Sequence, residues 1–372
     1  MIRFPTGAIV ISLLAFAAFG FGIGMQPTAI TPSSRQGMQE TIQANSFPRW
    51  RDRFRSERPS QDESAPPKYF SISIAGATRS YYLFDNSLGG NSQAPLLIML
   101  HGGGGSAKSA ISVTQLGKRA KSFGVDVIFP EGSSLGQPAR WNTGLSTGSA
   151  LDNVNDIGFL DKIVQVHATS SRPVFIAGLS NGGMMALRQI CQGSSRFAGA
   201  FVVAASTSET ILKTCNAKAS QPIALVHGKL DSIVPYSGGV VKHGNRSKVS
   251  TLSSTPLVSH DRLISFWRGR NGCSTQESGL EKLTSLRNSP DISLTNLASP
   301  LRSCRQTLSF TITNGNHGWP TDPSTLSPYE QRQFKLRRRI SVMRLGGKSG
   351  GPGDMDTTGI ILDLIGKWSA KS

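Results

Sequence analysis

The stretch from Val174 to Cys191 constrains the fold of this chain more than any other. Residues 174–177 form a short apolar run typical of a buried strand. The turn Gly178-Leu179-Ser180-Asn181-Gly182 follows, and apolar residues then recur at helical spacing through Cys191. Strand, tight turn and helix make a nucleophile elbow, in which a serine hydroxyl stands at the end of a sheet above a helix N-terminus. The stretch predicts that Ser180 is a nucleophile on an α/β scaffold.

The serine pattern alone is a weak signal, because Gly-x-Ser-x-Gly occurs four times in a chain with 40 glycines. The other three matches are centred on Ser134, Ser146 and Ser349. A Gln-Pro pair follows Ser134 where a helix would have to begin, no strand precedes Ser146, and Ser349 lies in a stretch rich in Gly, Lys and Pro. Ser180 alone has both the strand and the helix that the motif requires.

Apolar runs alternate with helix-like segments along the chain from about residue 69. We expect strands at 70–74, 79–84, 95–100, 125–130, 174–177, 201–204, 223–226 and 308–313, and helices at 106–122, 155–168, 181–191 and 356–368. The first two strands are expected to form a hairpin joined by Gly76-Ala77. This alternation predicts an α/β fold with a mostly parallel central sheet and helices on both faces.

Two further segments place an acid and a histidine beyond strand ends. Asp231 follows the strand at 223–226, and His317 lies in a glycine-rich loop after the strand at 308–313. Alone, either could be an ordinary turn or loop residue. Ser180, Asp231 and His317 nevertheless occur in the chain order of α/β-hydrolases, whose sites assemble past the carboxyl ends of parallel strands. In that arrangement His317 would act as general base and Asp231 would orient its ring.

A glycine run, residues 101–105, follows the strand at 95–100. The backbone amide of Gly102 or Gly103, with that of Asn181, would form an oxyanion hole. The run could instead cradle a phosphate, but no Gly-Lys-Ser/Thr follows it. His101 and His227 each stand beside a glycine at a strand end, and we expect both to be structural. We expect no metal and no cofactor, and the cysteine spacings fit no zinc pattern.

The N-terminus is typical of an export signal. Arg3 precedes an uncharged, mostly apolar run at 7–24, which is long for a signal peptide and short for a membrane span. We expect residues 1–25 to be a signal peptide or an uncleaved anchor, 26–67 a disordered basic linker, and 68–372 the catalytic domain. The protein would then be secreted or periplasmic, or held to the membrane by its N-terminal segment.

The chain is strongly basic, with a formal net charge of +18. Such a charge favours anionic surfaces and says nothing about fold. Basic residues gather at 49–58 and in an expected loop insertion at 321–353. These segments could simply solvate the protein, or they could dock it on an anionic polymer or envelope. We expect a monomer with an ester substrate, which could be polymeric, and no nucleic-acid partner.

The four cysteines allow three pairings. We predict Cys191–Cys215 and Cys273–Cys304, because the members of each pair are close in sequence and export leads to an oxidising space.

The motifs described above resemble those of the secreted α/β-hydrolase esterases that include poly(3-hydroxybutyrate) depolymerases and bacterial feruloyl and acetyl-xylan esterases. The resemblance covers about residues 69 to 320. The matching pieces are the 101–105 glycine run, Trp141-Asn142-x-Gly144, Asp156-Ile157-Gly158-Phe159, the 178–184 elbow, His227-Gly228-x-x-Asp231 with Val234-Pro235-Tyr236, Trp267 with Asn271-Gly272-Cys273, and His317-Gly318-Trp319-Pro320.

The resemblance implies an exported serine esterase that works through an acyl-enzyme intermediate. It implies Ser180 as nucleophile, Asp231 as acid and His317 as base, with Trp141 and Trp319 beside the substrate. One departure is Asn155, where the family usually has an aspartate, so that the role of this position is open. Another is the glycine run itself, which is more like the feruloyl and small-ester branch. Two alternatives remain: a catalytically silent hydrolase fold that binds envelope polymer, and a serine peptidase.

Overall fold

The computed structural model describes residues 66–87, 93–135, 138–145, 149–169, 171–194, 197–216, 220–243, 250–251, 255–273, 292–297, 304–335 and 353–370. All of them belong to one of two compact units of the chain, residues 59–372. The expected N-terminal segment, nearly all of the linker, and residues 336–352 of the expected insertion lie outside the described residues. So do Ser146 and Ser349.

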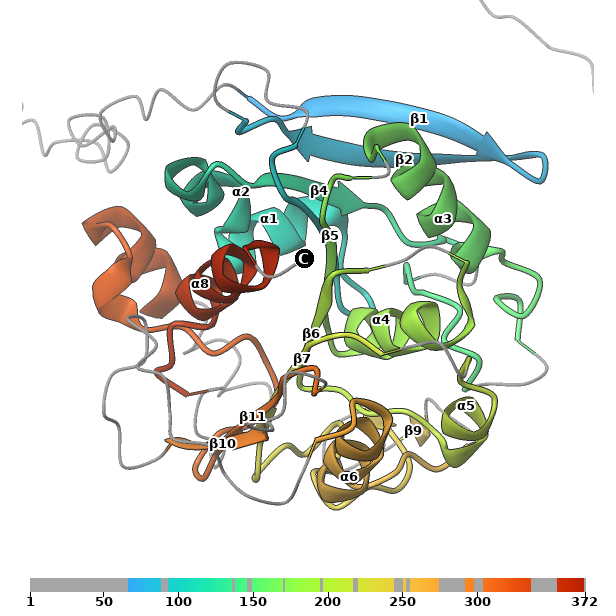
Figure 1. The fold of residues 1–372 in the computed structure, drawn as a ribbon, viewed down its shortest axis with the longest axis vertical. Helices are drawn as coiled ribbons and strands as arrows, with labels where there is room; N and C mark the ends of the chain where they lie inside the picture. The colour runs from blue at the N-terminus through green and yellow to red at the C-terminus, as the bar shows by residue number, and fades with distance from the viewer. Residues whose placement is uncertain are drawn as a thin grey trace, which may run out of the picture. The chain divides into compact units, whose positions relative to one another are not determined.

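Nine strands of the described residues form one sheet in the order β1-β2-β4-β3-β5-β6-β7-β11-β10 (Figure 1). Their bounds are β1 (Lys68–Ile74), β2 (Ala77–Phe84), β3 (Leu96–Leu100), β4 (Asp126–Pro130), β5 (Val174–Leu179), β6 (Gly199–Val203), β7 (Ile223–Gly228), β10 (Ile292–Leu297) and β11 (Thr307–Ile312). Strands β4, β3, β5, β6, β7 and β11 are parallel, whereas β1, β2 and β10 pair antiparallel at the edges. A small separate ladder joins β8 (Lys242–His243) to β9 (Ser250–Thr251).

Helices cover both faces of the sheet (Figure 1). One face carries α3 (Asp156–His167), α4 (Asn181–Gln192), α5 (Glu209–Lys213) and α6 (His260–Arg270), and the other carries α1 (Ala107–Thr114), α2 (Leu116–Arg119) and α8 (Thr357–Ser369). Side chains of β3 alternate between the two cores: Leu96, Ile98 and Leu100 enter the first, and Leu97 and Met99 the second. A strand covered on both faces must be apolar throughout, which explains the continuous run. The predicted α/β-hydrolase fold class is confirmed.

The prediction of a single helix from 106 to 122 is wrong. Ser106 does cap α1, but the segment divides into α1, α2 and a 3₁₀ turn at Ala120–Phe123. The break falls at Gln115, whose φ of 55° lies in the left-handed region. It lets Gly117 pack directly against Phe84, since a Cβ at this glycine would lie 2.6 Å from a ring atom. Helical periodicity alone carries no sign of that contact.

The β1–β2 hairpin is also shifted from its expected position by one residue. Its turn is Ala75-Gly76, with Ile74 paired to Ala77, so Ala77 belongs to the strand. Ala75 and Gly76 have φ values of 49° and 80°. Two-residue hairpins favour a turn with both central residues in this region because its twist matches that of the strands.

Both expected disulfides are present. Cys191–Cys215 joins α4 to the segment after α5, and Cys273–Cys304 joins the segment after α6 to the approach to β11. Among the described residues, no helix combines the length and apolarity that a membrane crossing requires.

Candidate active site

Four parallel strands bring the predicted site residues to one edge of the sheet. Strands β3, β5, β7 and β11 run in the same direction. The glycine run, Ser180, Asp231 and His317 follow their respective carboxyl ends. Segments more than a hundred residues apart in sequence therefore meet at this edge.

The chain around Ser180 turns as tightly as the motif requires. Ser180 has φ 55° and ψ −121°, an unfavourable conformation for a residue with a Cβ. The glycines on either side permit close contacts: a Cβ at Gly178 would lie 2.2 Å from the Gly182 carbonyl oxygen, and one at Gly182 would lie 2.5 Å from that of His101. Any side chain at these positions would push α4 away from β5 and β3.

Ser180, His317 and Asp231 form a continuous hydrogen-bond chain. His317 Nε2 lies 2.9 Å from Ser180 Oγ, and His317 Nδ1 lies 2.8 Å from Asp231 Oδ2. The other carboxylate oxygen of Asp231 accepts hydrogen bonds from the backbone amides of Ile233 and Val234, at 2.9 and 2.8 Å. The three residues singled out by order and spacing are thus in the geometry of a nucleophile, a base and an orienting acid.

A second histidine, His227, contacts the same carboxylate. Its Nε2 lies 2.9 Å from the Val234 carbonyl oxygen, which can only accept, so Nε2 carries the hydrogen. The same nitrogen is 3.3 Å from Asp231 Oδ2. Burial raises the pKa of Asp231, but the hydrogen bonds from His227 and His317 outweigh it and hold that pKa well below its usual range. We expected His227 to be structural; its spacing of four residues from Asp231 was the signal that it supports the acid.

The three expected oxyanion residues also lie together. A Cβ at Gly102 would lie 3.6 Å from Ser180 Cβ, and one at Gly103 would lie 3.3 Å from Asn181 Cβ. Asn181 is the first residue of α4, where backbone amides have no acceptor within the helix and the dipole favours negative charge. The glycine run therefore packs against the elbow, which is where amides that bind an oxyanion must stand.

His101 supports the glycine run, as expected for a structural residue. The Gly132 amide donates to its Nε2 at 2.9 Å, so Nδ1 carries the hydrogen and donates to the Gly102 carbonyl oxygen at 2.8 Å. Burial lowers the pKa of His101. A neutral ring therefore ties the run to the end of β4.

A cavity of about 620 Å³ opens beside Ser180 and His317. Its walls combine apolar and polar side chains. The apolar ones include Leu135, Trp141, Leu145, Met184, Ile233 and Val241, and the polar ones include Arg140, Asn142, Thr143, Ser149 and Asp152. Cavities of this size and character are typical of small-molecule sites.

The two tryptophans expected beside the substrate lie in different places. Trp141 lines the cavity, although it is only 1% exposed. Trp319 is absent from the cavity wall: it is buried in the core on the α8 side, where its indole N–H donates to Thr358 Oγ1 at 3.2 Å. The family resemblance implied a substrate contact for Trp319, but its ring is buried in the core. We assign Trp319 a packing role.

The structure also accounts for the Asn155 departure. The side-chain oxygen of Asn155 accepts a hydrogen bond from the Gly158 amide at 2.9 Å and caps α3. Asparagine and aspartate cap helices about equally well, so either residue serves at this position. Within the part of the chain that the structure describes, no group of three or more His, Cys, Asp or Glu residues could hold a metal ion.

Comparisons with known proteins show what this chain is similar to. Residues 154–255 match the family model for Phospholipase/Carboxylesterase. Feruloyl esterase B of Piromyces equi is 27% identical over 193 residues, which cover 51% of this chain and 35% of that protein, so only about a third of its length is matched. "Putative esterase NocK" of Nocardia uniformis subsp. tsuyamanensis is 25% identical over 256 residues, covering 67% of this chain and 73% of that protein. Among solved structures, an acetyl xylan esterase from Aspergillus awamori superposes with a TM-score of 0.46 and 14% identity, covering 69% of this chain and 97% of the other.

The sheet order and the site define an α/β-hydrolase. The family model and the two relatives show that the chain is similar in sequence to esterases of the α/β-hydrolase type.

Proposed function

We propose that this protein is an exported serine carboxylic-ester hydrolase that works through an acyl-enzyme intermediate. The observation that carries the proposal is the hydrogen-bond chain from Ser180 Oγ through His317 to Asp231, at 2.9 and 2.8 Å. A serine hydroxyl is a poor nucleophile unless a base removes its proton, and this chain supplies both the base and the group that orients it.

In the acylation step, Ser180 Oγ attacks the ester carbonyl carbon while His317 Nε2 accepts the hydroxyl proton. The carbonyl oxygen becomes an oxyanion that the Asn181 amide and a glycine amide of the 102–103 pair would bind. Losing one such donor typically costs about 3–4 kcal/mol of transition-state stabilisation. When the intermediate collapses, the C–O bond to the alcohol breaks, and His317 gives its proton to the leaving oxygen.

In the deacylation step, water attacks the acyl-enzyme carbonyl while His317 accepts a proton from the water. The bond to Ser180 Oγ then breaks, His317 returns the proton to that oxygen, and a carboxylic acid leaves. The pKa of Asp231 lies far below neutrality, because hydrogen bonds from His227 and His317 outweigh burial, so its negative charge stabilises the imidazolium in both steps.

We propose a feruloyl esterase-like or polyester depolymerase-like substrate range. The cavity of about 620 Å³, with apolar and polar side chains in its wall, supports an ester with a compact acyl or aryl group. The match to a protein named feruloyl esterase B supports the first of these types. The single catalytic domain at 68–372, the monomeric state and the export of the chain are parts of the same proposal. The two disulfides support export.

Two measurements test the proposal. A fluorophosphonate probe, followed by peptide mapping, should label Ser180 and no other serine. The unlabelled enzyme should hydrolyse at least one of p-nitrophenyl acyl esters, methyl ferulate, acetylated xylan and poly(3-hydroxybutyrate). Absence of labelling and of hydrolysis across this panel would favour a silent, polymer-binding hydrolase fold. Cleavage of peptides in place of esters would favour a peptidase.

A further inference from the structure

We propose that Arg79 and Asp156 are positioning residues for the oxyanion side of the site. They would act through Trp141 and Asn142, which connect them to the residues that carry the oxyanion donors. This inference rests on the proposed function, because it assigns to these residues a part in transition-state stabilisation at Ser180.

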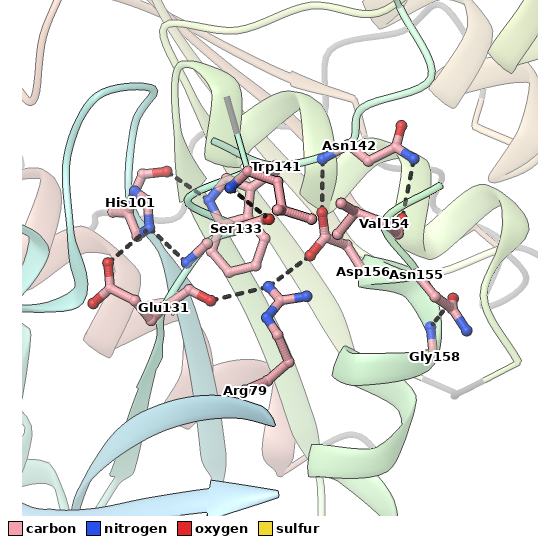
Figure 2. A network of polar contacts seen from close by, with 12 residues as sticks. Arg79, His101, Glu131, Ser133, Trp141, Asn142, Val154, Asn155, Asp156 and Gly158 are labelled. Atoms are coloured by element: carbon pink, nitrogen blue, oxygen red, sulfur yellow. Dashed lines mark hydrogen bonds and ion pairs between the residues drawn. The ribbon is translucent and has the colours of Figure 1, made fainter. Parts of the chain in front are cut away.

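The starting point is a buried ion pair that is hydrogen-bonded to the backbone of Asn142 (Figure 2). Arg79 on β2 donates from Nη2 to Asp156 Oδ1 at 2.7 Å, and the two side chains are 10% and 0% exposed. Asp156 is the first residue of α3. The Arg79 guanidinium also lies over the Phe159 ring, 4.3 Å from its centroid. An ion pair at this depth is held in one geometry, so whatever it bonds is held as well.

The second oxygen of Asp156 fixes the backbone of Asn142. Asp156 Oδ2 accepts the Asn142 amide at 2.7 Å (Figure 2). The Asn142 side chain donates to the carbonyl oxygens of Asp152 and Val154, at 3.2 and 3.1 Å. Its own carbonyl oxygen accepts from Arg188 at 2.7 Å. Residue 142 is therefore bonded through its amide, its carbonyl and its side chain.

Trp141 precedes Asn142 in the chain. It is hydrogen-bonded both to Asn181 and to the start of the glycine run, the two segments that carry the proposed oxyanion donors. Its backbone amide donates to Asn181 Oδ1 at 2.7 Å, which ties it to the elbow residue whose own amide is a proposed donor. Its indole N–H donates to the His101 carbonyl oxygen at 2.9 Å, directly before Gly102 (Figure 2). A shift of Trp141 would thus move Asn181 and the glycine run relative to each other.

Arg79 reaches the glycine run by a second path. The same Nη2 donates to the Glu131 carbonyl oxygen at 3.0 Å. The carboxylate of Glu131 accepts the Ala107 amide at 2.9 Å, and the amide of the next residue, Gly132, donates to His101 Nε2 at 2.9 Å. Both paths from Arg79 therefore end at the residues that carry or flank the oxyanion amides. An ion pair that only stabilised the fold would not need hydrogen-bond paths that lead to these residues.

The test compares three variants with a matched control. Arg79→Gln and Asp156→Asn remove one charge of the pair, and Arg79→Lys keeps the charge with a poorer fork geometry. The control is Arg172→Gln, which breaks the buried Arg172–Asp126 pair at the opposite edge of the sheet. Steady-state kinetics with a soluble p-nitrophenyl ester, inhibition by phenylboronic acid and thermal melting are measured for each variant, with the kinetics run well below the lowest melting temperature.

Arg79→Gln and Asp156→Asn should lower kcat by about 10- to 100-fold, the loss that a displacement of about 1 Å produces at a reacting centre. KM should change by less than about 3-fold, because the lost contacts act on the transition state. Affinity for phenylboronic acid, whose serine adduct places an oxygen in the oxyanion hole, should fall in parallel with kcat. Arg79→Lys should recover part of both losses. Arg172→Gln should lower the melting temperature and leave kcat and boronate affinity near wild type.

The inference is overturned if Arg79→Gln and Asp156→Asn lose thermal stability as Arg172→Gln does and keep wild-type kcat. It is also overturned if kcat falls while boronate affinity does not. If Arg79→Gln does not fold, Arg79→Lys and Asp156→Asn decide by the same criteria. A wild-type enzyme that hydrolyses no ester and is unlabelled at Ser180 would instead overturn the proposed function, and this inference with it.

Discussion

Two buried arginine–aspartate pairs lie at opposite edges of the parallel sheet. Arg79–Asp156 stands at the carboxyl edge, where Asp156 bonds the amide of the cavity residue Asn142. Arg172–Asp126 stands at the amino edge, because Asp126 is the first residue of β4 and Arg172 comes two residues before β5. Both arginine side chains are 10% exposed, so the pairs are alike in burial. They differ in what else they bond.

The amino-edge pair bonds the end of helix α3 and segments next to strands β2 and β3. Arg172 donates to the carbonyl oxygens of Ala94 and His167, each at 2.7 Å. Asp126 Oδ1 accepts the amides of Asn86 and Ser87, at 2.7 and 2.8 Å. None of these residues touches the cavity. The role of a buried ion pair therefore depends on the edge of the sheet at which it lies. At the amino edge the pair stabilises the fold, and at the carboxyl edge we infer that the pair also holds the geometry of the site.

The largest expected effect belongs to the carboxyl edge alone. Ser180→Ala should lower kcat by several orders of magnitude, up to about a million-fold, because the covalent step is lost. The free energy of unfolding should stay close to wild type. Ser134→Ala, at the exposed serine of a competing motif, should keep most activity. Ester hydrolysis measures the activity, and urea denaturation measures the free energy of unfolding. Full activity in Ser180→Ala would show that the carboxyl edge does not hold the nucleophile.

Asp231→Asn should have the next largest effect, about 10,000-fold on kcat, because the wrong imidazole tautomer is favoured. Hydrogen bonds from His227 and His317 outweigh burial and keep the pKa of Asp231 well below its usual range, so the wild-type acid stays ionised around neutral pH, and the variant should be slower than wild type across that range. Asp85→Asn is the control, because Asp85 pairs with Lys68 at the surface. A pH–rate profile of each variant checks this, and a loss below about 10-fold would contradict it.

Breaking the amino-edge pair should affect stability without affecting catalysis. Asp126→Asn or Arg172→Gln should reduce the free energy of unfolding by about 3–5 kcal/mol, since one buried charge then lacks its partner. Activity at temperatures well below the melting point should be unchanged. Urea denaturation beside kinetics measures both quantities. A kcat loss comparable to that of Arg79→Gln would show that the two edges are not separable.

An effect confined to acid pH is expected from His260, a buried histidine whose ring packs against His227. Its Nε2 lies 2.9 Å from Ser309 Oγ, and its ring packs against His227 and Tyr236. Burial, followed by the charge of His227, lowers its pKa to about 3. Because the unfolded chain then binds a proton that the folded chain does not, stability should fall as the pH drops from about 6.5 towards 3. The expected slope is about 1.4 kcal/mol per pH unit.

The check on this prediction is His260→Phe, which should flatten the acid limb of a plot of stability against pH. The variant loses the Ser309 contact at every pH, so the slope, and not the absolute stability, is the quantity to compare. An unchanged slope would show that other groups cause the acid sensitivity.

The sequence was sufficient for the parts of the site that depend on local signals. Ser180 lies in one continuous stretch that also contains its strand, its glycines and its helix. Asp231 and His317 each follow a recognisable strand. Arg79 and Asp156 are 77 residues apart, and nothing near either one indicates the other. The break at Gln115 and the inward turn of Trp319 likewise depend on packing partners distant in sequence, Phe84 and Thr358. Contacts between residues distant in sequence cannot be predicted from periodicity and spacing.

The smallest expected effect concerns the basic segments at 49–58 and 332–348, of which the structure describes only 332–335. If they only solvate the protein, neutralising them should leave activity on soluble and insoluble substrates unchanged. Wild type and variant should then bind an anionic polymer equally at low salt. If the segments dock the enzyme, the variant should lose activity on insoluble substrate alone, and added salt should weaken wild-type binding, since exposed charges are screened beyond about 8 Å at physiological ionic strength. We expect equal binding. A salt-reversible loss of binding in the variant would extend the functional part of the molecule beyond the carboxyl edge.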